Sequence, residues 1–271
     1  MTNPFSVSNK NIILSGATGV LGKAMASHLA EQGAHVIILG RNASKVEALV
    51  NQIKENKGSA YAAVADVTNE RALEILKEEL SQQFSHIDVL INAAGGNMPG
   101  AIVTPEQTIA DLSSEDVKKI IDLNYLGTFL PIKVFLPLLN TGKTASIINI
   151  SSMAANRPMT RVMGYASAKA AVDNLTKWLS VEFCKKYGSH LRVNAVAPGF
   201  FLTEQNRQLL TQEDGSLTSR GNQIIDHTPM ARFGDPEDLF GTIQWLCSDA
   251  SKFVTGTIIP VDGGFSAFSG V

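Results

Sequence analysis

Short apolar runs alternate with longer stretches of helical periodicity along the whole chain. The apolar runs predict β-strands at residues 11–15, 35–39, 60–64, 87–91, 145–150, 191–197 and 257–261. Apolar positions spaced three and four residues apart predict helices at residues 20–32, 44–55, 69–83, 113–139, 163–187 and 236–248. The strand runs show little alternation, which is typical of strands buried on both faces. Strands that alternate with helices form parallel sheets with helices on both sides, so the pattern predicts a doubly wound, seven-stranded α/β fold.

The predicted elements form one unit with a single irregular segment. No composition break, Gly/Ser linker or repeat divides the 271 residues, so we expect one domain spanning residues 1–271. The segment between Pro198 and Asp235 opens with Pro-Gly, contains a polar stretch and ends in His227-Thr228-Pro229. It follows a predicted strand directly, at the sheet edge where open α/β folds bind their ligands. We therefore predict a substrate lid at about residues 200–234, with a tolerated surface insertion as the alternative.

Composition and charge narrow the class of protein. Hydrophobic residues make up 44% of the chain, and the formal net charge of −2 favours neither nucleic acid nor a membrane surface as partner. The two cysteines, Cys184 and Cys247, predict neither a disulfide framework nor a thiolate metal site. The N-terminus lacks an apolar signal region, and we find no apolar run of the roughly 18 residues needed to span a membrane. We expect a soluble cytoplasmic protein with a small-molecule ligand and no metal.

A glycine-rich segment lies between the first predicted strand and the first predicted helix. Glycines allow the backbone to turn sharply and to approach a pyrophosphate, while the helix N-terminus offers free N–H groups and the positive end of its dipole. A turn that needs glycine for its dihedral angles is the alternative. We predict that this segment binds a dinucleotide through Gly16, Thr18, Gly19, Val20, Leu21 and Gly22.

Three further strand ends supply candidate cofactor contacts. Asp66 and Val67 follow the third predicted strand, and Asn92, Ala93, Ala94 and Gly95 follow the fourth. All of them should share one sheet edge with the glycine segment, although Asp66 alone could be a helix N-cap. The second strand ends at Gly40 and Arg41, where an NAD site would carry an acid. Because an arginine suits a 2′-phosphate, we favour NADP(H), with NAD(H) possible.

A tyrosine and a lysine four residues apart supply candidate acid–base chemistry. Tyr165 and Lys169 share one face of a predicted helix. A phenol titrates near about 10, and a neighbouring positive charge lowers that pKa toward neutrality. Ser152, which follows the fifth predicted strand, can hydrogen-bond a carbonyl or hydroxyl oxygen in the same pocket. Taken without its context, the Tyr–Lys pair could be an ordinary helix surface pair.

The order and spacing of these motifs resemble the short-chain dehydrogenase/reductase family over essentially the whole chain. The matching elements are SGATGVLG, Asp66-Val67, INAAG, Asn124, Ser152, Tyr165-Ala-Ser-Ala-Lys169, Pro198-Gly199 and Val261-Asp262-Gly263-Gly264. The resemblance implies a single-domain Rossmann fold and an NAD(P)-dependent alcohol/carbonyl oxidoreductase. One departure is Val20, which stands where the common family pattern has its second glycine.

The resemblance also implies roles for individual residues. Tyr165 would be the general acid in reduction and the base in oxidation, and Lys169 would lower its pKa and bind the nicotinamide ribose. Ser152 would orient the reacting oxygen, and Asn124 would hold a helix irregularity and a proton-relaying water. The nicotinamide carboxamide would be cradled by Pro198, Gly199 and Thr203. Members of the family usually pair long helices such as 113–139 and 163–187, which implies a homodimer or homotetramer.

Within the family, the chain is similar to the sugar-acid branch, the D-mannonate oxidoreductase (fructuronate reductase) and gluconate dehydrogenase type. This similarity rests on residues 94–97, 200–207, 225–230 and 264–266. A polyhydroxylated acid needs many hydrogen bonds and a cation for its carboxylate. The predicted pocket and lid offer Asn97, Arg157, Arg161, Gln205, Asn206, Arg207 and His227, among which Arg207 is the preferred carboxylate partner. The alternatives are a 3-oxoacyl-thioester reductase and a nucleotide-binding regulator without catalytic activity.

Overall fold

Seven parallel strands form one sheet in the order β3-β2-β1-β4-β5-β6-β7 in the computed structural model, which describes residues 3–203 and 206–270. The strands are β1 (Asn11–Ser15), β2 (His35–Gly40), β3 (Ser59–Val64), β4 (Val89–Asn92), β5 (Ala145–Ile150), β6 (Leu191–Pro198) and β7 (Ile258–Val261). Each lies within two residues of its predicted bounds. The strand order reverses between β1 and β4, which creates the crevice where such sheets bind ligands.

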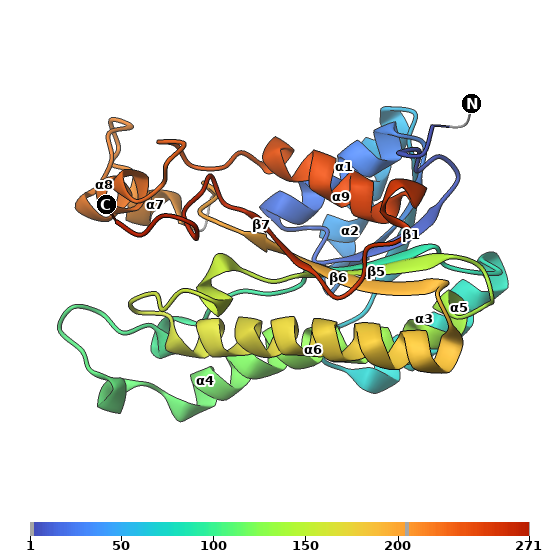
Figure 1. Ribbon diagram of the computed structural model, residues 1–271, viewed down its shortest axis with the longest axis horizontal. Helices are drawn as coiled ribbons and strands as arrows, with labels where there is room; N and C mark the ends of the chain where they lie inside the picture. Colours follow the sequence, from blue (N-terminus) through green and yellow to red (C-terminus); the bar gives the residue numbers. More distant parts are fainter. Residues whose placement is uncertain (1–2, 204–205, 271) are drawn as a thin grey trace.

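Helices cover both faces of the sheet (Figure 1). One face carries α1 (Val20–Glu31), α2 (Ala43–Glu55) and α9 (Phe240–Cys247). The other carries α3 (Glu70–Gln83), α4 (Ser114–Ile121), α5 (Gly127–Leu139) and α6 (Met163–Tyr187). Two more helices, α7 (Arg207–Leu210) and α8 (Ser219–Asp226), lie in the segment predicted to be a lid. The prediction of a doubly wound α/β fold with a seven-stranded parallel sheet is confirmed.

The central strands are apolar throughout because each has a core on both sides. In β1, Ile12 and Leu14 pack toward α1 and α2, whereas Ile13 packs toward α3 and α5. Every residue of β5 and β6 is buried. The register pairs Ser15 with Asn92, and Asn92 with Asn149, so the carboxyl ends of the strands lie at one edge. The motifs that follow the strands therefore converge there.

The predicted helix at 113–139 is interrupted. A π-helical turn, η3 (Asp122–Leu126), separates α4 from α5. The whole stretch from Ser114 to Leu139 is long and apolar enough to cross a membrane, contrary to our reading of the sequence. Half of its apolar window is buried inside the structure, against α3 and the sheet. The core therefore accounts for half of this apolar window.

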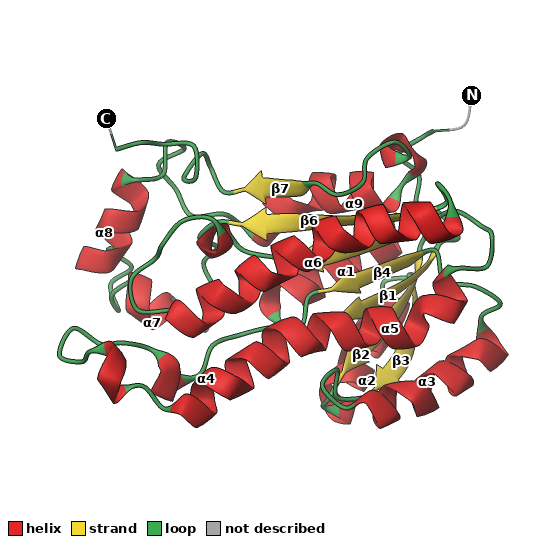
Figure 2. Ribbon diagram, turned by 60° about the horizontal axis from the view of Figure 1, so that its bottom comes forward, coloured by secondary structure: helices red, strands yellow, loops and turns green. Residues whose placement is uncertain are grey.

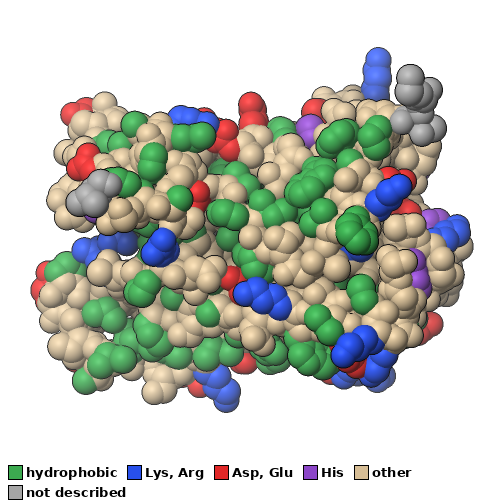
Figure 3. All heavy atoms as spheres, in the orientation of Figure 1, with side chains coloured by type: hydrophobic (Ala, Val, Ile, Leu, Met, Phe, Trp, Pro, Cys, Tyr) green, Lys and Arg blue, Asp and Glu red, His purple; other side chains and the backbone are tan. Residues whose placement is uncertain are grey.

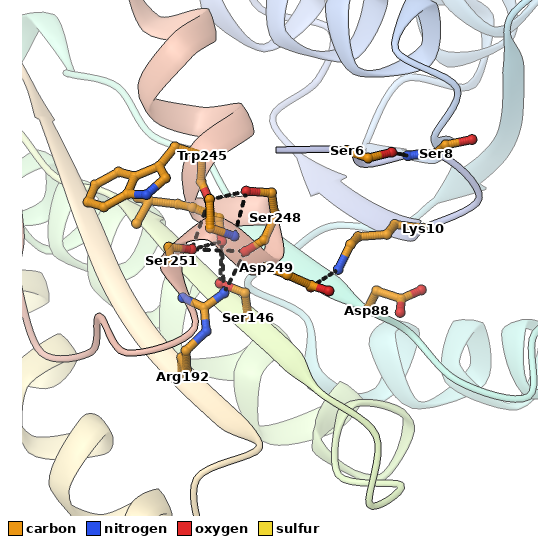
Figure 4. A network of polar contacts seen from close by, with 12 residues as sticks. Ser6, Ser8, Lys10, Asp88, Ser146, Arg192, Trp245, Ser248, Asp249 and Ser251 are labelled. Carbon is orange, nitrogen blue, oxygen red and sulfur yellow. Dashed lines mark hydrogen bonds and ion pairs between the residues drawn. The ribbon is translucent and has the colours of Figure 1, made fainter. Parts of the chain in front are cut away.

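A buried arginine near the start of β6 joins this strand to the end of α9 (Figure 4). It lies at the amino ends of the strands, away from the carboxyl ends where the motifs converge. Arg192 is 4% exposed and donates to the carbonyl oxygens of Leu246 at 3.1 Å and Val254 at 3.2 Å. Ser146 also donates to the carbonyl of Leu246, at 3.0 Å. No carboxylate within the described ranges forms an ion pair with Arg192, and burial lowers the pKa of its guanidinium. The arginine thus places a cation at the negative end of the α9 dipole.

Candidate active site

The glycine segment forms a tight turn between β1 and α1. Gly16 has a φ of +69°, and a Cβ on Gly22 would lie 2.2 Å from the Gly16 carbonyl oxygen, so neither position has room for a side chain. Ser15 at the end of β1 accepts hydrogen bonds from the backbone N–H groups of Ala93 at 3.2 Å and Ala94 at 3.3 Å. These bonds hold the segment after β4 against the glycine turn.

The N-terminus of α1 has no side-chain cap. Its N-cap residue is Gly19, and Val20, at the first helical position, is 36% exposed. The N–H groups of this first turn, which also holds Leu21 and Gly22, are free to receive an anion at the positive end of the helix dipole. The segment therefore fits a pyrophosphate, and Val20 in place of a glycine leaves that fit intact.

The adenosine end of the predicted cofactor site is formed by the ends of β2 and β3. Thr18 approaches Gly40, since a Cβ on Gly40 would lie 3.5 Å from the Thr18 Cγ2. Arg41 Nη1 lies 3.7 Å from Asp66 Oδ2, with 68% of the Arg41 side chain exposed. Asp66 accepts from the Thr68 N–H at 2.9 Å, whereas Asn69 is the residue that caps α3. The N-cap alternative for Asp66 is therefore wrong.

Two of the predicted cofactor residues are built into the protein interior. Asn92 is 1% exposed, and its Nδ2 donates to Asn149 Oδ1 at 2.9 Å, which ties β4 to β5. Val67 is 4% exposed and packs against Gly127 at the start of α5. Through these contacts, both residues support the site from beneath.

The turn after β6 is held by the last strand. The Gly199 N–H donates to the Val261 carbonyl at 2.9 Å, and a Cβ on Gly199 would lie 2.7 Å from the Asp262 Cα. Pro198 ends β6, and Thr203 follows in the same loop. The predicted carboxamide cradle thus stacks on the Val261–Gly264 motif at the sheet edge.

The first turns of α6 bring Tyr165 and Lys169 to this edge. Lys169 is 3% exposed, and its Nζ donates to the Ile150 carbonyl at the end of β5, at 2.7 Å. The same Nζ lies 5.6 Å from the centre of the Tyr165 ring. A Cβ on Gly95 would lie 3.2 Å from Lys169 Nζ and 2.7 Å from Asn124 Oδ1. The structure therefore gathers Tyr165, Lys169, Asn124 and Gly95 around one point.

The pKa values of Tyr165 and Lys169 differ from those expected from the sequence. Burial raises the pKa of the Tyr165 hydroxyl, and a side-chain hydrogen bond with Ser152 opposes that rise. Burial also lowers the pKa of Lys169 to about 8, although the negative charge of Asp173 raises that pKa in part. The expected lowering of the Tyr165 pKa by Lys169 is wrong for these residues by themselves, because loss of hydration disfavours the phenolate.

The π-helical turn η3 positions Asn124, which is fully buried. Its Nδ2 donates to the Gly96 carbonyl at 2.8 Å and to the Ile120 carbonyl at 2.9 Å, while its Oδ1 accepts from the Gly96 N–H at 3.2 Å. The wider helical turn and these bonds hold the amide against the loop after β4. The helix irregularity expected at Asn124 is present.

Asp173 is a buried carboxylate that our sequence reasoning missed. It is 5% exposed, lies one turn beyond Lys169 on α6, and accepts from Asn156 Nδ2 at 3.1 Å. Its Oδ1 has no hydrogen-bond partner among the described residues. Burial raises the pKa of this carboxyl, whereas Ser151, Asn156, Lys177 and Lys169 lower it. The four-residue spacing from Tyr165 to Lys169 continues to Asp173, and this spacing was the signal in the sequence that could have identified it.

We expect Asp173→Asn to move the alkaline limb of the pH profile of kcat/KM to lower pH. The carboxylate raises the pKa of Lys169, so its removal leaves the lysine charged over a narrower range below about 8. Initial rates from pH 6 to about 9.5 would measure this shift, for which Glu182→Gln, near the far end of α6, is the control. An unchanged profile in Asp173→Asn would show that this carboxylate does not act on Lys169.

The predicted substrate residues separate into two groups. The amide of Asn206 is engaged with the main chain, since it donates to the Phe201 carbonyl at 2.8 Å and accepts from the Thr203 N–H at 2.7 Å. His227 is exposed, with Nδ1 2.8 Å from the Gln223 carbonyl and its ring 6.3 Å from that of Phe268. Arg157 donates through Nε to the Ser266 carbonyl at 2.9 Å. These contacts favour packing within residues 200–234 or against the C-terminal residues for all three.

Three other predicted substrate residues differ in their exposure. Asn97 is half-buried and accepts from the Met98 N–H at 3.0 Å. Arg161 is half-buried just before α6, whereas Arg207 is exposed at the start of α7. Gln205 lies outside the described residues. Within the described ranges, no cluster of three or more His, Cys, Asp or Glu side chains could hold a metal ion.

Comparison with known proteins agrees with this geometry. A family profile described as "Enoyl-(Acyl carrier protein) reductase" matches residues 16–266. The uncharacterized oxidoreductase UxuB of Bacillus subtilis is 46% identical, over 98% of each chain. The chain belongs to the short-chain dehydrogenase/reductase family.

Two solved structures are similar over nearly their whole length. A provisionally assigned D-mannonate oxidoreductase from Haemophilus influenzae with bound NAD superposes with a TM-score of 0.92, at 39% identity over 99% of this chain and 100% of that one. A provisionally assigned gluconate 5-dehydrogenase from Beutenbergia cavernae, with NADP at low occupancy, gives 0.85 at 29% identity over 98% and 100%. The chain is therefore an NAD(P)-dependent oxidoreductase acting on CH–OH groups.

Proposed function

We propose that this oxidoreductase interconverts a secondary alcohol and a ketone on a sugar acid of the mannonate/fructuronate or gluconate type. The convergence of Tyr165, Lys169 and Asn124 beside Ser152 carries the reaction class. The polar lid and the similarity to a D-mannonate oxidoreductase and a gluconate 5-dehydrogenase support the substrate class.

In the proposed mechanism, Ser152 and Tyr165 hold the substrate oxygen between them. A bound nicotinamide would supply the hydride in reduction and accept it in oxidation. Burial raises the pKa of Tyr165, so the phenol keeps its proton at neutral pH and can donate it to the forming alkoxide. Ser152 stabilises the charge that develops on that oxygen.

Lys169 and Asn124 would then renew the proton on Tyr165. The Lys169 pKa of about 8 lies near neutrality, so the ammonium can exchange a proton at working pH. Asn124 holds the Gly96 main chain beside it, where an ordered water would connect the lysine to solvent. In oxidation the same groups carry the proton in the opposite direction.

We propose that the cofactor is NADP(H) in preference to NAD(H). Gly40 ends β2 without an acidic side chain, and the neighbouring Arg41 guanidinium is largely exposed at the predicted adenosine site. Its contact with Asp66 is long, so it remains free to bind a 2′-phosphate. The pyrophosphate would lie on the first turn of α1, and Lys169 would bind the nicotinamide ribose.

Arg41→Ala should raise the KM for NADPH by about 10- to 100-fold and leave the KM for NADH nearly unchanged. A charge-assisted hydrogen bond contributes roughly 1.5–3 kcal/mol, which only the phosphorylated cofactor would lose. Steady-state kinetics with each cofactor measure the effect, and Lys54→Ala, in the last turn of α2, is the matched control. Equal losses with both cofactors would refute the role in discrimination.

The substrate proposal is tested by a panel of hexonates and ketohexonates with NADH and NADPH separately. Turnover of these compounds, with little on acetoacetyl thioesters, is the expected result. Turnover confined to thioesters would establish the 3-oxoacyl reductase alternative. Tight cofactor binding without turnover of any alcohol or ketone would establish a nucleotide-binding regulator.

We further propose that the enzyme is a cytoplasmic homodimer or homotetramer that pairs through α5 and α6. These helices run side by side over one face of the sheet (Figure 2). Trp178 and Val181 are 56% and 55% exposed there. A hollow of about 500 Å³ beside Trp178 is lined by Tyr125, Phe129, Ala171, Asn174 and Leu175. Exposed aromatic groups beside such a hollow are typical of subunit interfaces.

Trp178→Lys should shift the protein toward a monomer. Burying a tryptophan at the centre of an interface contributes about 2 kcal/mol or more, and a buried lysine opposes association. Light scattering coupled to gel filtration over a range of concentrations measures the subunit number. Ile75→Lys on α3, at a site that is 54% exposed, should leave it unchanged. An unchanged mass for Trp178→Lys would place the interface elsewhere.

A further inference from the structure

Two arginines from distant parts of the chain meet beside the predicted active site. Arg161 lies in the loop that leads into α6, and Arg220 lies in the first turn of α8. Arg220 Nη1 lies 3.4 Å from the hydroxyl of Thr160, the neighbour of Arg161, 60 residues away in the chain. Both arginine side chains are half-buried. The lid helix therefore contacts the β5–α6 loop through a cation.

The two guanidinium groups repel one another. Burial and the positive charge of Arg161 lower the pKa of Arg220. Within residues 3–203 and 206–270, neither group forms an ion pair with a carboxylate, whereas Arg41 and Arg232 each do. Two half-buried like charges raise the free energy of the folded protein until an anion lies between them. Planar guanidinium groups suit a carboxylate, which can accept bonds from both.

The backbone at Arg161 is also unusual. Its φ is +76°, a left-handed conformation in which a long side chain is uncommon. The Arg161 carbonyl accepts from the Val103 N–H at 3.0 Å, which ties this loop to the segment after η1 (Pro99–Ala101). An arginine at a position where glycine or asparagine would be less strained points to a task for its side chain.

Arg161 lies close in the chain to the predicted proton donor. It precedes Tyr165 by four residues, and Tyr165 packs against the small buried cluster of Ala101, Ile120 and Ala168. Figure 3 shows Lys and Arg side chains at a notch between the region of α7 and α8 and the region of the loop before α4. Because Arg220 reaches Thr160, next to Arg161, and Arg161 lies four residues before Tyr165, we expect a substrate bound at Tyr165 to approach both arginines.

We propose that Arg161 and Arg220 together bind the carboxylate of the substrate and thereby draw α8 over the active site. The inference rests on the proposed function, which it deepens by assigning the carboxylate subsite. It makes Arg220 a specificity-determining residue, and it replaces the exposed Arg207 as the principal carboxylate partner. A ketone without a carboxylate leaves the two charges uncompensated, so it is selected against.

The test compares Arg161→Gln, Arg220→Gln and the double variant on two substrates, a ketohexonate and a neutral ketose of the same chain length. Each single variant should raise the KM for the keto acid about 10- to 100-fold, as expected for loss of a charge-assisted hydrogen bond. The rates with the neutral ketose should stay within about two-fold of wild type or rise. Arg220→Lys should recover part of the affinity, since it restores a cation without the planar fork.

Matched controls separate this role from a structural one. Arg71→Gln removes an exposed cation from α3 and should not alter the KM for the keto acid, whereas Arg207→Gln tests the carboxylate partner that the sequence favoured. Equal losses on both substrates, or a loss confined to Arg207→Gln, would overturn the assignment of Arg161 and Arg220. Wild-type turnover of neutral ketones without any turnover of keto acids would instead refute the proposed function, and this inference with it. Thermal unfolding of each variant confirms that the fold is retained.

Discussion

Replacing Tyr165 with Phe is expected to lower kcat by about 10²- to 10⁴-fold, the usual contribution of a positioned general acid. Burial raises the pKa of this phenol, so it stays protonated at neutral pH, and Ser152 opposes that rise only in part. Phe keeps the ring and its packing against Ala101, Ile120 and Ala168, so only the proton donor is lost. Cofactor affinity should therefore remain at the wild-type value.

Single-turnover rates measure the loss of catalysis in Tyr165→Phe, and fluorescence titration with NADPH measures its cofactor affinity. Tyr61→Phe is a suitable control, because Tyr61 lies on the edge strand β3 and packs edge-on against Phe84. Retention of more than about a tenth of wild-type turnover in Tyr165→Phe would remove this residue from the proton transfer. A parallel loss of cofactor binding would assign it a mainly structural role.

Arg192→Ala should lower the free energy of unfolding by about 3 kcal/mol, because it removes charge-assisted bonds worth roughly 1.5–3 kcal/mol and leaves a cavity. The guanidinium donates to Leu246 and Val254 and joins β6 to α9. Arg192→Met fills most of the space without the charge. Arg192→Met should lose less stability than Arg192→Ala, because the carbonyls of Leu246 and Val254 still accept hydrogen bonds from Ser146 and Asn194.

Urea unfolding of both variants measures the difference, with Lys10→Ala as a control. Lys10 forms an ion pair with Asp249 at 2.9 Å in which the aspartate is 69% exposed, so its loss should change stability by less than about 1 kcal/mol. Equal stability of Arg192→Ala and wild type would mean that the desolvation of the buried cation cancels its bonds. Greater loss in Arg192→Met than in Arg192→Ala would contradict the role assigned to packing.

The fold was largely predictable because its signals are local. Each strand is an uninterrupted apolar run, since both sheet faces are covered, and the glycine turn lies directly between β1 and α1. The bounds of α6 agree with the predicted 163–187. The π-helical turn η3 was not readable from periodicity, because it depends on bonds between Asn124 and the distant Gly96. The helix α8 was likewise hidden in a polar segment.

By itself, the sequence predicted a doubly wound, seven-stranded parallel sheet, the edge where the motifs meet, and the placement of Tyr165 and Lys169 on one helix face. Periodicity and short spacings are properties of neighbouring residues, so they can be recognised without knowledge of the fold. Only the tertiary structure decided that burial raises the pKa of Tyr165, that Asp173 lies beneath Lys169, and that Arg220 reaches the loop of Arg161. Solvation and the approach of distant charges are set by packing between segments far apart in the chain, and no local pattern records them.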